Sequence, residues 1–101
     1  MSRREQLQEM LQLEPDDVFL NYALAKAFVA EDRIEEGKRQ FRRTLQLDPD
    51  HVAGHFQLAQ VLASEDDTDE ARKVVTRGID VARKANDSHA VMEMTEFLEM
   101  L

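Results

Sequence analysis

The chain contains an internal repeat with a period of 34 residues. The segment LEPDDV at residues 13–18 returns as LDPDHV at residues 47–52, and the apolar positions that follow keep the same register. Leu24, for example, recurs as Leu58. Repeats of this length are typical of helical repeat proteins, in which each unit buries its apolar face against its neighbours.

Each repeat has the pattern of two helices, the first repeat covering residues 16–49 and the second residues 50–83. Apolar residues recur every three or four positions within each predicted helix, and no run alternates with the period of a strand. Asp16 or Asp17, after Pro15, is a good candidate for the first N-cap, and Asp50 is the candidate in the second repeat. Asp32 resembles the first residue of a capping box, which predicts that a helix starts there.

The two ends of the chain have the pattern of half repeats. Residues 3–14 match the second helix of a unit, and residues 87–101 match the first helix of a third unit. Charged residues in the last segment stand where a following helix would pack, as expected of a terminal cap. The sequence therefore predicts an all-α fold of six helices, an antiparallel α-solenoid that forms a single domain over residues 1–101.

The repeat resembles the tetratricopeptide repeat, whose pattern is W-x2-L-G-x2-Y, then A-x3-F, then P. Neither unit has the tryptophan. The first unit supplies Asn21-x2-Leu24-Ala25-x2-Phe28, then Gly37-x3-Phe41, then Pro49. The second supplies His55-x2-Leu58-Ala59-x2-Leu62, then Ala71-x3-Val75. The match covers nearly the whole chain, whose short form is similar to small stand-alone bacterial proteins of this family.

The resemblance implies a noncatalytic module that binds a protein or peptide segment in a concave groove. In this family the first helix of each repeat lines that groove. Tyr22 and Phe56 would be apolar anchors there, and Lys26 and Gln60 would be polar contacts. Carried over position by position, the groove residues are Phe19, Tyr22, Lys26, Val29, Ala53, Phe56, Gln60, Ser64, Ala90, Met94 and Phe97.

A second interpretation remains open, because apolar residues at helical spacing are often packed within the chain. The C-terminal helix is rich in methionine, leucine and phenylalanine. It could fill the groove itself or pair with a second copy, which would make the protein a self-associating module and a homodimer.

His51 and His55 are four residues apart and would share one face of a helix. A transition-metal site needs at least a third ligand, and the repeat already accounts for both side chains. Ser64 and Ser88 lack a nucleophile-elbow context, and the chain has no cysteine. We therefore expect no metal, no cofactor and no enzyme activity. A metal-dependent enzyme is the third interpretation, and His55→Ala would test it.

The net charge of the chain limits the classes of partner that it is expected to bind. The formal charge of -8 disfavours duplex nucleic acid and anionic membranes, which both reward positive charge. The second helix of each unit carries basic residues, which we expect to be solvated faces balanced by nearby carboxylates. The chain has neither a signal-peptide pattern nor a bilayer-length apolar run, so a cytoplasmic location is expected.

Overall fold

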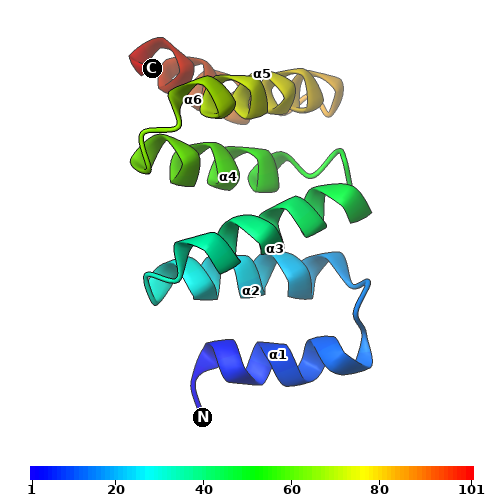
Figure 1. The fold of residues 1–101 in the computed structure, drawn as a ribbon. Helices are drawn as coiled ribbons and strands as arrows, with labels where there is room; N and C mark the ends of the chain where they lie inside the picture. Colours follow the sequence, from blue (N-terminus) through cyan, green and yellow to red (C-terminus); the bar gives the residue numbers. More distant parts are fainter. The chain divides into compact units, whose positions relative to one another are not determined.

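The computed structural model describes all residues 1–101, which form six α-helices and no strand (Figure 1). This result confirms the predicted all-α helical repeat fold. Figure 1 shows that consecutive helices within each half of the chain run antiparallel. The helices are α1 (Arg3–Leu13), α2 (Val18–Ala30), α3 (Ile34–Leu47), α4 (Val52–Ser64), α5 (Thr68–Lys84) and α6 (Ser88–Met100).

The helices form two compact units, Met1–Pro49 and Asp50–Leu101. In the first unit α2 packs most extensively on α3, and α1 packs on α2. In the second unit α5 packs on both α4 and α6. Each of these interfaces joins helices that are neighbours in the chain. That residues 1–101 act as one domain stays a prediction.

One apolar cluster of the first unit lies between α1 and α2. Leu7 from α1 meets apolar side chains that recur every three or four residues along α2. Burying each of the larger side chains stabilises the fold by roughly 2 kcal/mol relative to leaving it exposed. The cluster consists of Leu7, Leu20, Ala23, Leu24 and Phe28.

Two guanidinium groups flank the ring of Phe28. The Cζ atoms of Arg4 and Arg33 lie 6.0 and 5.1 Å from the ring centroid. Arg4 Nε donates to both carboxylate oxygens of Glu31, at 3.0 and 3.1 Å, and so ties α1 to the end of α2. Arg33 donates two hydrogen bonds of 2.8 Å to Glu36. The carboxylates thus hold both cations beside the aromatic ring.

Asn21 is a buried polar residue whose hydrogen bonds are all made within the first unit. Its Nδ2 donates to the carbonyl oxygens of Pro15 at 3.1 Å and Asp17 at 2.8 Å. Its Oδ1 accepts from Gln40 Nε2 on α3. Only 1% of Asn21 is exposed, so an unmade bond here would be costly. The residue joins the α1–α2 loop to α3 at the position of the family's tryptophan.

The core of the second unit lies between α5 and its neighbours. Ala59 from α4 and Met94 from α6 meet apolar side chains of α5, and both are fully buried. The cluster consists of Ala59, Val75, Ile79, Ala82 and Met94. Gly78 permits the close approach of these helices. A β-carbon there would lie 2.8 Å from His55 Cβ and 2.9 Å from Met94 Sδ.

The structure confirms one expected N-cap and corrects another. Asp17 Oδ1 accepts a 2.9 Å hydrogen bond from the Leu20 amide, as expected at the start of α2. The cap of α4 is His51 rather than Asp50. His51 Nδ1 accepts a 2.8 Å hydrogen bond from the Gly54 amide, which satisfies one of the donors left open at a helix start.

The predicted capping box at Asp32 is wrong, because this residue belongs to the end of α2. Asp32 has φ 60°, in the left-handed region, and its amide bonds to the Val29 carbonyl. The next amide, of Arg33, bonds to the Phe28 carbonyl, which completes a Schellman motif. α3 then starts at Ile34, and its N-cap residue, Arg33, makes no side-chain cap hydrogen bond. Asp66 and Asn86 have the same positive φ after α4 and α5.

Candidate functional site

One face of α2 carries three of the predicted groove residues along a surface hollow. Phe19, Tyr22 and Lys26 line it together, and its volume is about 330 Å³. Small side chains of α2 complete the lining, together with Arg3 of α1. We call this hollow the α2 cleft and define it by Arg3, Phe19, Tyr22, Ala23, Lys26, Ala27 and Ala30.

Tyr22 is held in place from two sides. Its ring is tilted against the buried ring of Phe41, with centroids 6.0 Å apart, and Lys26 Nζ lies 5.5 Å from its centroid. Burial raises the pKa of the Tyr22 phenol. The phenol therefore stays protonated and uncharged at neutral pH. Phe19, in contrast, is 67% exposed and leaves its ring available at the surface.

Arg3 is the charged residue of the cleft that the sequence did not reveal. It lies at the start of α1, in the N-terminal half repeat, where no complete motif assigns a groove position. Neither Arg3 nor Lys26 makes an ion pair in the structure, although Arg4, the next residue, is paired with Glu31. The cleft thus has two exposed cations beside two aromatic rings.

Val29 does not line the cleft. It is half-buried, and its Cγ2 would be 2.7 Å from a β-carbon at Gly37. Its side chain therefore lies against the backbone of α3 at Gly37.

In the second unit, Phe56 of α4 contacts Phe97 of α6. Their centroids are 5.6 Å apart in an edge-to-face arrangement, and both rings are partly buried against the unit's core. Met94 is fully buried and presents no surface to a partner in this structure. Of the other predicted groove residues in this unit, Ala53, Gln60 and Ser64 are exposed and Ala90 is partly buried.

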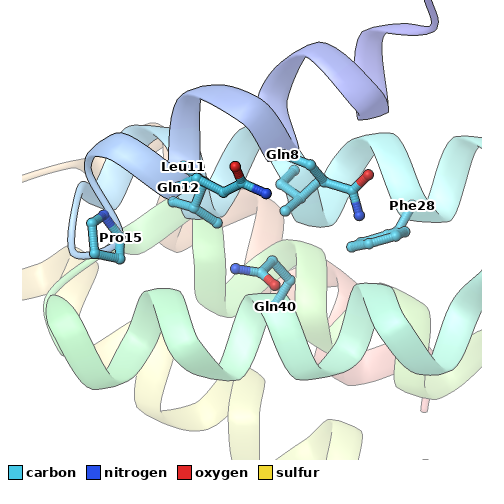
Figure 2. Close-up of a pocket in the computed structure, with 7 residues that line it drawn as sticks. Gln8, Leu11, Gln12, Pro15, Phe28 and Gln40 are labelled. Carbon is cyan, nitrogen blue, oxygen red and sulfur yellow. The ribbon is translucent and has the colours of Figure 1, made fainter.

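A larger pocket of about 550 Å³ is lined by residues of α1, α2 and α3 (Figure 2). Leu24 and Phe28 of α2 line it together with glutamine residues of α1 and α3. Figure 2 shows Gln8 and Gln12 on one side and Gln40 on the other. No charged side chain lines this pocket, whose residues are Gln8, Leu11, Gln12, Pro15, Leu24, Phe28 and Gln40.

The three histidines occupy separate local environments. His51 caps α4, His55 is buried within the second unit, and His89 Nε2 lies 3.1 Å from Glu93 on α6. No group of three or more histidine, aspartate or glutamate side chains is arranged to hold a metal ion. None of the helices has the length and apolar character needed to cross a bilayer.

The model of the tetratricopeptide repeat family matches residues 30–94, which is more than half of the chain. The chain belongs to the tetratricopeptide repeat family. Members of this family are generally noncatalytic and mediate protein–protein interactions. The tetratricopeptide assignment agrees with the six helices and with the repeat period. A comparison with curated protein sequences finds no match.

Solved structures give the same result for the fold. A tetratricopeptide repeat domain protein from Salinibacter ruber is 28% identical, with a TM-score of 0.81 over 85% of this chain and 87% of that one. A protein from Bordetella parapertussis is 24% identical, with a TM-score of 0.85 over 99% and 87%. MamA is 15% identical, with a TM-score of 0.74 over 95% and 63%. The last two support the tetratricopeptide fold alone.

Proposed function

We propose that this tetratricopeptide protein is a noncatalytic module that holds a segment of a partner protein in its groove. The α2 cleft supports this proposal, because it brings exposed Phe19 and Lys26 together beside an anchored Tyr22. Aromatic side chains bury a large area at low cost in conformational entropy, which suits them to be binding hot spots.

Comparative capture of partners tests this function. Wild type is immobilised beside Phe19→Ala/Lys26→Ala, and bound proteins from the source organism are quantified by mass spectrometry. The control is Leu13→Ala, which removes an apolar side chain that is 86% exposed on α1 but lies outside the cleft. We expect specific partner proteins to bind wild type and the control variant. The same proteins should be absent from the cleft variant. Equal binding by all three proteins would overturn the proposal.

Self-association is the second candidate function, and α6 favours it. Met92 and Met100 of α6 are 52% and 79% exposed, and Phe97 already covers Phe56 on one side. An apolar helix face of this kind could pair with a second copy. Light scattering across a hundredfold range of protein concentration separates the candidates. A mass that rises with concentration, and falls back in Met92→Gln/Met100→Gln, would support a homodimer.

A further inference from the structure

The charge of the α2 cleft is opposite to that of the whole chain. The formal net charge is -8, yet the only charged side chains that line the cleft are Arg3 and Lys26. No carboxylate lines the cleft, and neither cation is paired with one elsewhere. The nearby cations Arg4 and Arg33 are, in contrast, each neutralised by a glutamate. The cleft is thus a local positive site in an acidic protein.

The remaining lining is apolar or neutral. Ala23, Ala27 and Ala30 leave space between the rings and α1, because their side chains end at the β-carbon. Phe19 supplies an exposed ring at one end. The Tyr22 phenol is uncharged, so it does not repel an anion. The space of about 330 Å³ has room for one or two side chains of an extended segment and not for a folded domain.

Taken with the proposed function, on which it rests, this arrangement identifies the chemistry of the partner. We infer that the α2 cleft takes an acidic polypeptide segment, with an apolar side chain over the alanines and carboxylates at Arg3 and Lys26. The two cations lie on different helices, so carboxylates on both sides of the apolar residue would be bound. Electrostatic attraction to such a segment would also discriminate against basic ones.

Two other surfaces of the chain show why the inference is specific to this cleft. The pocket in Figure 2 is lined by neutral amides and apolar groups, which carry no preference for charge. A hollow on α5 is lined by Arg72, Lys73, Thr76 and Arg77 and contains no aromatic or apolar side chain. Of these three surfaces, only the α2 cleft joins unpaired cations to aromatic rings. The α5 hollow therefore supplies the matched control.

Selection from a random library of displayed 12-residue peptides tests the inference on the full chain. We expect peptides selected on wild type to be enriched in aspartate and glutamate next to an aromatic or aliphatic residue. A selected peptide, labelled and measured by fluorescence anisotropy, should bind Arg3→Gln/Lys26→Gln about tenfold more weakly, since exposed charge pairs each contribute a few-fold in affinity. Its affinity for wild type should also fall as salt is added.

Lys73→Gln/Arg77→Gln removes the same charge from α5 and should bind the peptide as wild type does. An equal loss in this control would show a general charge effect and overturn the inference. Peptides that depend on Phe19 but show no acidic enrichment would overturn the inference and leave the proposed function standing. If Phe19→Ala weakens the binding of none of the selected peptides, the proposed function is overturned as well. Circular dichroism and urea unfolding of every variant establish that each is folded.

Discussion

Val29 fills the space that the missing β-carbon of Gly37 leaves between α2 and α3. A β-carbon at position 37 would lie 2.7 Å from Val29 Cγ2 and 3.3 Å from the Ala25 carbonyl oxygen. The equivalent positions one repeat later are Ala63 and Ala71. The first unit thus builds this interface from one large and one small residue. The second unit builds the equivalent interface from two alanines. The combined volume of the two side chains, rather than the size of either one, matches the spacing of the two helices.

We therefore predict strong coupling between Val29 and Gly37. Gly37→Ala alone should lower the free energy of unfolding by about 1 kcal/mol, because overpacking outweighs the gain in helix propensity. Val29→Ala alone should lower it by roughly 1 to 2 kcal/mol. The double variant should be close to wild type in stability. A double-mutant cycle by urea unfolding measures the coupling, and additive effects within about 0.3 kcal/mol would contradict the prediction.

Gly78→Ala should destabilise the second unit by about 1 to 2 kcal/mol, despite the better helix propensity of alanine. The new methyl would meet His55 Cβ at 2.8 Å, and this atom is fixed to the backbone of α4 and cannot rotate away. Thermal unfolding measures the loss, and amide chemical shifts locate it in α4, α5 and α6. A variant as stable as wild type would show that α4 and α5 can separate without cost.

Asp32→Gly should raise the free energy of unfolding by about 0.5 kcal/mol. Glycine adopts the φ of 60° at this position without the steric cost that a β-carbon imposes, although it loses more entropy on folding. Asp32→Ala is the matched control and should be less stable than wild type, because alanine lacks the tolerance of aspartate for this region. Differential scanning calorimetry ranks the three proteins, and an alanine variant above the glycine variant would contradict this account.

Stability should fall in acid through Glu36. The hydrogen bond that Arg33 donates lowers the pKa of the Glu36 carboxyl below its ordinary value of 4.5. Below pH 4.5 the unfolded chain binds this proton first, so the stabilisation is complete above that pH and is lost as the pH falls through the folded pKa. Urea midpoints for wild type and Glu36→Gln should differ at pH 7 and converge in acid. A constant difference from pH 7 to pH 3 would rule out this linkage.

The sequence predicted the helices well because the repeat places apolar residues at helical spacing in both units. It located Phe19, Tyr22 and Lys26 on one face of α2, and the structure brings them into one cleft. It did not reveal Arg3, which reaches the cleft from a neighbouring helix. It misplaced Asp32 because aspartate is favourable both before a helix and in the left-handed turn after one. The burial of Met94 depends on how α6 packs on α5, which periodicity alone does not specify.

The pairing of each helix with its neighbour in the chain has a consequence for synthesis. No long loop has to close before apolar side chains meet, so the entropic barrier to folding is low and folding is expected to be fast. All the contacts among α1, α2 and α3 are available once the chain has been made as far as Pro49. The N-terminal unit can therefore start to fold on the ribosome while the residues of α4 to α6 are still being added.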